Sequence, residues 1–361
     1  MRMKYVDFLA MVGLATARRE YRPASLKMSC SQLVRDRIDP LVNPGVLGTP
    51  HIHQIVGGNS FNTTMDPLTH DPATLSTCTT CTFTDDFSNY WTAIMYFRAR
   101  NNTYHRVPQL GSLFHESARE GGMTIYYFPQ FVNPKPGTIK AFAPGFRMRV
   151  GHPDRVHPVN ESGHPRPEHK PTALYDGITY TCLETEGTRF TNLTSSFPPH
   201  PCPSGILTTL PFPSCWDGKN LDSTDHQSHV SFAEGGTVGY TQGGKCPASH
   251  PVMIPQIMLE TRWDTTLFND PDLWPEEQGK QPFLWSFGDG VGYGHHGDYV
   301  FGWRGDSLQT TFDRVDCSGD QICGLPVQTI ERANGCFGER RVVEGVDGWL
   351  GEMPGGVVVR D

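Results

Sequence analysis

Glycine and proline limit what this chain can fold into more than any other feature. The 361 residues include 38 Gly and 30 Pro, and both residue types interrupt helices and favour turns. Strand and helix patterns do not alternate along the chain, which argues against a Rossmann fold or a TIM barrel. We therefore predict a mainly β protein, an antiparallel β-sandwich or jelly-roll-like single domain with long disulfide-stapled loops and few short helices.

Several segments have the residue patterns of strands in such a fold. Residues 91–97 and 123–128 are rich in aromatic side chains, and residues 252–259 are mostly apolar. Residues 51–56 alternate polar and apolar side chains, which would place His51 and His53 on one face of a strand. Residues 306–315 are the best candidate for a helix.

The N-terminus has the pattern of a secretory signal peptide. Arg2 and Lys4 precede a short apolar run, and Ala15-Thr16-Ala17 is a small-x-small cleavage pattern. We predict a signal peptide over residues 1–17 and one β-rich, catalytic-like domain over residues 18–361, which would place the protein outside the cell or in the lumen of the secretory pathway. Nothing else approaches the ~20 apolar residues that a membrane-spanning helix needs.

Ten cysteines fit an exported protein with disulfide bonds. The C-x-x-C spacing of Cys78 and Cys81 leaves zinc binding as an alternative, although no second such pair follows. Spacing does not fix the pairing, and we predict the short loops Cys202–Cys215 and Cys317–Cys323. Sequons predict N-glycosylation at Asn62, Asn101, Asn160 and Asn192.

Ionisable residues are most concentrated between Ser214 and His229, which hold three Asp, one Lys and two His. Unpaired charges are costly to bury and exposed ones need no such density, so this stretch predicts part of a site. We expect two remote segments to converge with it, one around His51 and one around His296. The predicted catalytic residues are His51, His53, Asp217, Lys219, Asp222, His226, His229, His296 and Asp298.

Imidazoles and carboxylates support two kinds of chemistry, acid–base catalysis and metal binding. We expect no organic cofactor, with a divalent metal as an alternative because His51 and His53 have a spacing known in metal sites. A purely structural role for these residues is the third interpretation. The predicted substrate-binding aromatic residues are Trp91, Tyr96, Trp216 and Tyr293. A net charge of −8 gives no reason to expect nucleic acid or an anionic membrane as a partner, and the oligomeric state stays open.

Several short, distinct motifs follow one another along most of the chain. They include Arg37 to Gly45, His51-Ile52-His53, Phe212 to Lys219, and Gly294 to Asp298. With these motifs the chain resembles the secreted fungal family catalogued as domain of unknown function 1996. The sequence departs from the family pattern at Ala93, Thr224, Gln227 and Phe232, where Pro, Pro, Lys and Tyr are usual.

The resemblance implies two classes of partner, small molecules and glycans. Secreted fungal proteins of this general kind are associated with hetero-Diels–Alderases of tropolone sesquiterpenoid pathways. In such a cyclase a His/Asp cleft would help a hydroxylated aromatic precursor lose water, and the resulting quinone methide would be held against a terpene alkene. Other members look like cell-wall proteins, so the alternatives are a glycan-active hydrolase or polysaccharide lyase, and a non-catalytic glycan-binding wall protein.

Overall fold

The structure is a computed structural model in which two antiparallel sheets form the centre of the molecule. It describes residues 24–112, 118–129, 135, 137–155, 177–189, 191, 193–234, 244–277, 280–314 and 322–360. The predicted signal peptide, Asn160, Asn192 and Cys317 lie outside the described residues. Within the described ranges, no helix is both long enough and apolar enough to cross a membrane.

The larger central sheet has seven strands, in the order β1-β8-β16-β12-β10-β11 with β7 paired to β16. Its strands are β1 (Leu26–Cys30), β7 (Gln109–Leu110), β8 (Met123–Phe128), β10 (Thr179–Cys182), β11 (Leu193–Thr194), β12 (Ile206–Pro211) and β16 (Gln256–Trp263). The second sheet has five strands in the order β2-β3-β4-β18-β9. They are β2 (Val34–Asp36), β3 (His53–Gly57), β4 (Asn89–Ala93), β9 (Arg147–Gly151) and β18 (His296–Val300).

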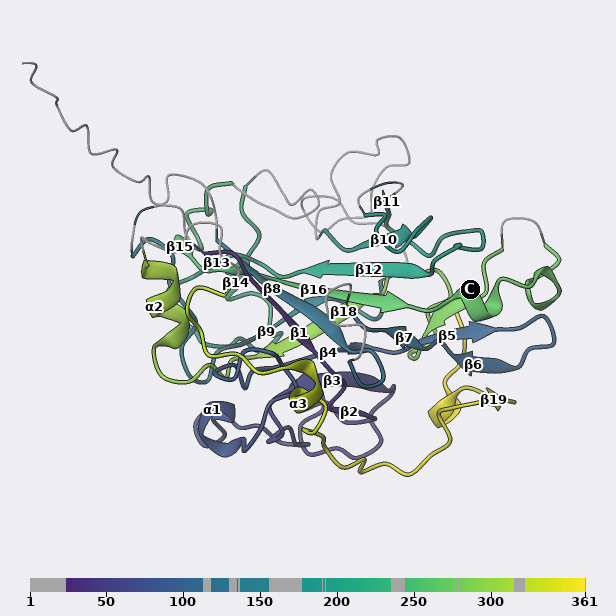
Figure 1. The fold of residues 1–361 in the computed structure, drawn as a ribbon, viewed down its shortest axis with the longest axis horizontal. Helices are drawn as coiled ribbons and strands as arrows, with labels where there is room; N and C mark the ends of the chain where they lie inside the picture. Colours follow the sequence, from purple (N-terminus) through teal and green to yellow (C-terminus); the bar gives the residue numbers. More distant parts are fainter. Residues whose placement is uncertain are drawn as a thin grey trace, which may run out of the picture.

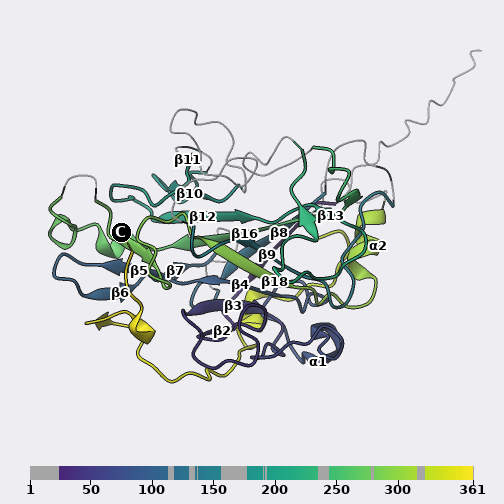
Figure 2. The same ribbon diagram turned by 180° about the vertical axis from the view of Figure 1, so that it is seen from behind.

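Two small sheets and a few short helices complete the fold. The sheet β17-β5-β6-β19 contains β5 (Met95–Arg98), β6 (Tyr104–Arg106), β17 (Phe283–Trp285) and β19 (Trp349–Leu350), and the sheet β14-β13-β15 contains β13 (Cys215–Trp216), β14 (Val230–Ser231) and β15 (Val252–Met253). The helices are α1 (Pro72–Leu75), α2 (Ser307–Asp313), α3 (Ile330–Ala333), η1 (Thr266–Phe268), η2 (Pro271–Leu273) and η3 (Pro354–Gly356). In both views α1, β2 and β3 lie on the opposite side of the molecule from β10 and β12 (Figures 1 and 2).

The main hydrophobic core lies between the two central sheets. Side chains alternate across each strand, so Val56, Tyr90, Tyr299 and Met148 form one row across β3, β4, β18 and β9. All four belong to a buried cluster that includes Tyr127 and other residues of the seven-stranded sheet. The prediction of a mainly antiparallel β-sandwich is therefore confirmed.

The other face of the five-stranded sheet is covered by the parts of segment 37–66 that flank β3, namely residues 37–52 and residues 58–66, which contain no strand. Ile38, Leu41, Phe61 and Met65 from this segment pack with Trp91 and neighbouring side chains in a separate buried cluster. Polar residues of the same strands share this face because they occupy the positions that alternate with the core residues. This covered outer face therefore carries buried polar groups, among them His53 and Asp298.

Four disulfides join eight of the described cysteines: Cys30–Cys81, Cys78–Cys336, Cys182–Cys202 and Cys215–Cys246. The predicted Cys202–Cys215 pair is wrong. Cys202, in the loop after β11, bonds to Cys182 of β10. Cys215 is in β13, which pairs with β15, and it bonds to Cys246. Cys78 and Cys81 belong to two different disulfides, so their thiolates are not available to zinc. Cys317 lies outside the described residues.

The predicted elements are confirmed where residue pattern and tertiary pairing agree. Residues 123–128 form β8 and residues 306–315 contain α2. Residues 91–97 are divided between β4 and β5 at Ile94, where the chain passes from the five-stranded sheet to a smaller one. Residues 252–259 are divided between β15 and β16 around Pro255, which has no N–H for a strand ladder.

A buried hydrogen-bond network crosses the core at Asp86. Tyr90 donates its hydroxyl to Asp86 Oδ2 at 2.6 Å, and the Ser88 amide donates to Asp86 Oδ1 at 2.9 Å. The hydroxyls of Tyr90 and Tyr127 lie 2.6 Å apart. Burial raises the pKa of Asp86 from 3.8 to about 6, although the hydrogen bonds from Ser88 and Tyr90 oppose this change.

This pKa predicts how stability changes with pH. Between about pH 4 and pH 6 the folded protein keeps a proton on Asp86 that the unfolded chain has released, so the free energy of unfolding should fall as pH rises. The rise from 3.8 to about 6 corresponds to about 3 kcal/mol. Urea unfolding at several pH values should show this fall in the wild type and a flatter profile in Asp86→Asn. Parallel profiles for the two proteins would contradict the prediction.

Candidate active site

Three histidines are brought together on the covered face of the five-stranded sheet. His53 opens β3 and pairs with Ala93 of β4, and Gly297 of β18 pairs with Thr92. In this antiparallel register His296 of β18 lies beside Ala93, on the side of β4 opposite to His53. The two histidines therefore flank a methyl side chain, which leaves room for their rings to approach each other. His51 lies two residues before His53, and its ring contacts the rings of both His53 and His296.

The ring nitrogens of these histidines converge. His51 Nε2 and His296 Nε2 are 3.2 Å apart, and the ring centroids of His51 and His53 are 4.3 Å apart. His53 Nδ1 lies 3.1 Å from the Ile38 carbonyl oxygen and His296 Nδ1 lies 2.8 Å from the Gly294 carbonyl oxygen. A carbonyl can only accept, so both Nδ1 atoms carry the hydrogen. The Nε2 atoms of His53 and His296 therefore carry lone pairs, and the lone pair of His296 accepts the Nε2–H of His51.

Burial keeps all three imidazoles neutral. Exposure is 8% for His51, 0% for His53 and 4% for His296. Burial lowers the pKa of His51 and of His296 well below the usual value, and the neighbouring histidines and Arg149 lower both further. Burial also lowers the pKa of His53, although the charge of Asp39 opposes the change. At neutral pH the cluster is thus a set of uncharged nitrogen donors.

Two carboxyl groups and one guanidinium lie beside the histidines. Asp298 follows His296 on the same face of β18 and pairs with Arg149 of β9. Burial raises the pKa of Asp298 well above its usual value, the charge of Asp39 adds to this, and Arg149 opposes it. Asp39 accepts hydrogen bonds from the amides of Leu41 and Val42 through Oδ1, while its Oδ2 lies 4.0 Å from His53 Nε2.

Gly151 lets the edge strand β9 approach this site. It stands opposite His296 in the strand register and has a positive φ of +77°. A Cβ at this position would lie 2.2 Å from the His295 carbonyl oxygen. Only glycine therefore fits here. The close approach of β9 places Arg149, two residues before Gly151, opposite Asp298 in the register.

A cavity of about 470 Å³ opens onto the histidines. Its lining combines buried His51 and His296 with the exposed side chains of His152, Asp154 and Arg360, so the imidazoles lie at its inner side. The remaining lining residues are Asp39, Val42, Asn43, Pro50, Arg149, Pro153 and Phe287. The volume is in the range of small-molecule sites, about 300–1,000 Å³.

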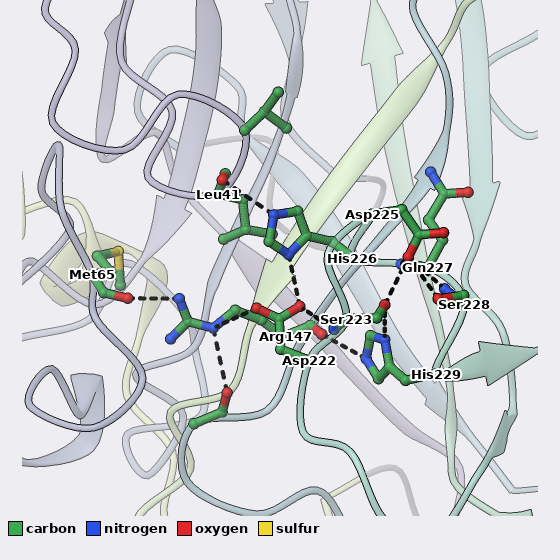
Figure 3. Close-up of polar contacts among 12 residues, drawn as sticks. Leu41, Met65, Arg147, Asp222, Ser223, Asp225, His226, Gln227, Ser228 and His229 are labelled. Atoms are coloured by element: carbon green, nitrogen blue, oxygen red, sulfur yellow. Dashed lines mark hydrogen bonds and ion pairs between the residues drawn. The ribbon is translucent and has the colours of Figure 1, made fainter.

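The ionisable stretch that first suggested a site forms a neighbouring hydrogen-bonded loop (Figure 3). His226 Nδ1 lies 2.7 Å from Asp222 Oδ1 and its Nε2 lies 3.2 Å from the Leu41 carbonyl oxygen. His229 lies between the Ser223 hydroxyl, at 2.8 Å, and the Arg147 carbonyl oxygen, at 2.9 Å. Both ring nitrogens of each histidine are therefore occupied.

Asp217 and Asp225 stabilise turns in the same loop. Asp217 accepts from the amides of Lys219 and Asn220, and Asp225 accepts from the amides of Gln227 and Ser228. Lys219 itself is exposed. The outer side of the loop forms an open polar groove of about 780 Å³, lined by Asn220, Asp222, Ser223, Thr224, Asp225, His226 and Ser228.

The loop contacts β9 beside the histidine site through a backbone carbonyl and through the Gln227 side chain. The Arg149 amide donates to the His226 carbonyl oxygen at 2.9 Å, and Gln227 donates to the Gly151 carbonyl oxygen at 3.1 Å. No residue from 217–229 lines the histidine cavity. The structure thus brings His51, His53 and His296 together with Asp298 beside them, and places Asp217, Lys219, Asp222, His226 and His229 on the adjacent loop.

The predicted aromatic wall lies elsewhere. Trp91 is fully buried against Phe61, and Tyr96 is fully buried in the small sheet with its hydroxyl donated to the Val346 carbonyl. Trp216 donates from Nε1 to the Asn220 carbonyl oxygen. Tyr293 is half-buried, and none of these four residues lines the cavity.

Sequence reasoning found only His51 and His296 among the residues that line the cavity, and it missed Asp39, Arg149 and Phe287, which contact or face them. Phe287 packs on His51 and His296 with ring centroids 5.2 Å and 4.9 Å apart, respectively. Asp39 lies within the motif Arg37 to Gly45, whose turn-forming Pro and Gly residues explain the motif without a functional role. Arg149 could have been found from the alternation in Arg147 to Gly151, which puts two arginines on one strand face.

Two groups of side chains are close enough to hold a metal ion. The ligand atoms of His51, His53 and His296 lie within 4.8 Å of one another, as do those of Cys182, His200 and Cys202. Cys182 and Cys202 form a disulfide, which removes their thiolates as ligands. The three buried histidines are thus the metal-competent group among the described residues.

Comparisons with known proteins give one result. A family model described as "Domain of unknown function (DUF1996)" matches residues 39–303, which is well over half of the chain and includes the histidines, the cavity strands and the ionisable loop. Neither the curated proteins nor the solved structures include a match.

Proposed function

The chain belongs to the family of domain of unknown function 1996, and from its histidine cavity we propose that it is a small-molecule cyclase of the hetero-Diels–Alderase type. The observation that carries this proposal is the convergence of three histidines, of which His51 and His296 line the inner side of a 470 Å³ cavity and His53 lies behind them. A cavity of this size suits one or two small molecules better than a polymer chain. Its reaction would be dehydration of a hydroxylated aromatic acid, followed by addition to an alkene.

Arg149 and Arg360 would bind the acidic oxygen of the aromatic precursor. Both line the cavity, and Arg149 is half-buried, with no hydrogen-bond partner for its Nε among the described residues. A tropolone-type ring carries an acidic hydroxyl, and guanidinium groups bind such anions by charge-assisted hydrogen bonds. This contact would orient the ring with its hydroxymethyl carbon toward the histidines.

The histidine nitrogens would assist departure of the hydroxyl group. As neutral groups they can donate a ring N–H, or hold a metal ion, against the oxygen of the carbon–oxygen bond that breaks. The carbon–oxygen electron pair leaves with that oxygen, and the acidic ring hydroxyl loses its proton, so the products are water and a neutral quinone methide. Val42, Pro50 and Phe287 supply apolar surface for the alkene that adds next.

The test is a conversion assay with the purified protein, a hydroxymethyl tropolone precursor and a medium-ring sesquiterpene alkene. We expect a faster reaction and one stereoisomer of the adduct in excess. A rate and an isomer ratio equal to those without protein would overturn the proposal.

Arg149 offers a test of substrate binding. Arg149→Met keeps much of the side-chain volume but removes the cation, so we expect KM for the acidic precursor to rise at least about 10-fold, with a smaller change in kcat. Arg155→Met is a nearby control outside the cavity lining. Equal KM values in the wild type and in Arg149→Met would contradict the binding role.

A glycan-active hydrolase or lyase is the second candidate because of the polar groove beside the site. That groove is open, larger than the cavity, and lined only by polar side chains. Asp222 and Asp225 are the carboxylates that it offers for acid–base work. Release of oligosaccharides from fungal wall polysaccharides, lost in Asp222→Asn, would favour this candidate over the cyclase.

We also propose that the protein is secreted after removal of residues 1–17 and is glycosylated. The four disulfides fit an oxidising compartment. Asn101 is exposed and accepts a hydrogen bond from the Thr103 hydroxyl at 2.7 Å, whereas Asn62 is half-buried. Peptide mass analysis of secreted protein should find a glycan at Asn101, and an unmodified Asn101 peptide would contradict this.

A further inference from the structure

We propose that His51, His53 and His296 bind one divalent transition-metal ion, with zinc the best fit, and leave one coordination position open to the cavity. The inference deepens the proposed function, and it rests on that function only for the role of the ion, since binding itself depends on the three side chains alone. Four observations carry it.

The first observation is the spacing of the donor atoms. A zinc–nitrogen bond is about 2.0–2.1 Å long, so two histidine nitrogens on a tetrahedral ion are about 3.4 Å apart. His51 Nε2 and His296 Nε2 are 3.2 Å apart, and all three donors fall within 4.8 Å. The three nitrogens can therefore contact one ion with little movement of their rings.

The second observation is the state of the donors. The Nδ1 atoms of His53 and His296 are tied to the backbone carbonyl oxygens of Ile38 and Gly294. Metal-binding histidines usually donate their other ring N–H in this way, because the contact fixes the tautomer and the ring orientation. Both Nε2 atoms consequently carry a lone pair before any ion binds, and that of His296 faces His51 Nε2 at 3.2 Å.

The third observation is an unsatisfied buried nitrogen. His53 is 0% exposed, and its Nε2 has no hydrogen-bond partner among the described residues. A buried polar atom without a partner is costly, which calls for a ligand at that position. The nearest carboxylate oxygen is Asp39 Oδ2 at 4.0 Å, so direct pairing within the protein does not satisfy it.

The fourth observation concerns charge and access. The imidazoles bring no negative charge of their own, and the carboxyl group of Asp39, with Oδ2 4.0 Å from His53 Nε2, lies beside them to offset a divalent cation. His51 and His296 line the cavity, so a ligand from the cavity can reach the ion. A set of three protein ligands and one open position is typical of catalytic rather than structural zinc.

In the proposed reaction such an ion would bind the departing hydroxyl oxygen. His51, His53 and His296 would hold the ion, which would supply Lewis-acid stabilisation of that oxygen. The carbon–oxygen bond breaks with its electron pair on oxygen, and the proton given up by the acidic ring hydroxyl is taken up with it, so water is released. No oxidant or reductant is required, because the ion keeps its charge throughout.

The experiment measures metal without substrate. The secreted protein is analysed for metal by plasma mass spectrometry, then stripped with a chelator and titrated with Zn²⁺ and Co²⁺. We expect one Zn²⁺ per chain with a higher melting temperature, and intense visible bands of tetrahedral Co²⁺. His53→Gln and His296→Gln should reduce the bound metal below about one tenth per chain.

Two further variants make the result specific. Ala93→Val keeps all three histidines but adds methyl groups between His53 and His296, so it should weaken Zn²⁺ binding at least about 10-fold. His250→Gln removes a half-buried histidine outside the cavity lining and should bind as the wild type does. Circular dichroism checks that each variant is folded.

The outcomes separate this inference from the proposed function. Absence of bound Zn²⁺ in the folded wild type, or binding unchanged in His53→Gln and His296→Gln, would overturn the metal site even if the precursor is converted. One Zn²⁺ per chain that depends on these histidines would establish the site even if no cyclase activity is found.

Discussion

His51→Gln is expected to lower kcat/KM for the cyclisation at least about 10²-fold, a larger effect on activity than that of Arg149→Met or His226→Gln. His51 is the histidine that both lines the cavity and contacts His296 Nε2 at 3.2 Å. Glutamine keeps a similar length and polarity, but its amide nitrogen has no basic lone pair. Neither proton transfer nor metal binding through this position would survive the change.

The matched comparison is His226→Gln on the neighbouring loop. His226 is held between Asp222 and the Leu41 carbonyl and does not line the cavity. We expect less than about a 10-fold change in kcat/KM, together with a lower melting temperature because two hydrogen bonds are lost. Steady-state kinetics and thermal melts of both variants provide the test. A larger loss of kcat/KM in His226→Gln than in His51→Gln would place the reaction in the polar groove and contradict the assignment to the cavity.

Much of the fold follows from local patterns, but the pairing of strands does not. The aromatic run at 123–128 and the helix pattern at 306–315 agree with their surroundings, so local preference and tertiary structure point the same way. Residues 91–97 look equally continuous in the sequence. They are divided at Ile94 because β4 and β5 pair with different partners, and that depends on segments nearly 200 residues away.

The candidate site shows the same division. Period-two alternation placed His51 and His53 on one face, which is a local property. The position of His296, across Ala93 from His53, depends on the register of β3, β4 and β18. No local sequence pattern predicts that register.

The loop 214–229 misled for a physical reason. Short Asp, Asn and Ser side chains hydrogen-bond nearby backbone amides, so a loop without regular structure collects them for its own stability. Asp217 and Asp225 do this, and His226 and His229 anchor the loop to segment 37–66 and to β9. Density of ionisable residues therefore identified a stabilised loop beside the site.

The second large effect is expected from the disulfide Cys78–Cys336. Replacing both cysteines by alanine should lower the free energy of unfolding by about 5 kcal/mol, because the bond closes a loop with a sequence separation of 258. Cys336 is buried with Ile38, Leu41 and Trp91, so this bond fastens the C-terminal segment to the layer that covers the histidines. Urea unfolding under non-oxidising, thiol-free conditions measures the loss.

The double variant Cys182→Ala, Cys202→Ala is the control, since its loop has a sequence separation of only 20. The chain-entropy argument gives about 3 kcal/mol for a loop of that length. Cavity access should also differ, because the Cys78–Cys336 bond lies in the cluster that packs over the site, while the Cys182–Cys202 bond ties β10 to the β11–β12 loop within the seven-stranded sheet. We therefore expect the first variant to lose Zn²⁺ and activity at lower urea concentration than the second. Equal losses in stability and in metal retention would show that the covering layer is held by packing around Trp91 and Phe61 rather than by the disulfide.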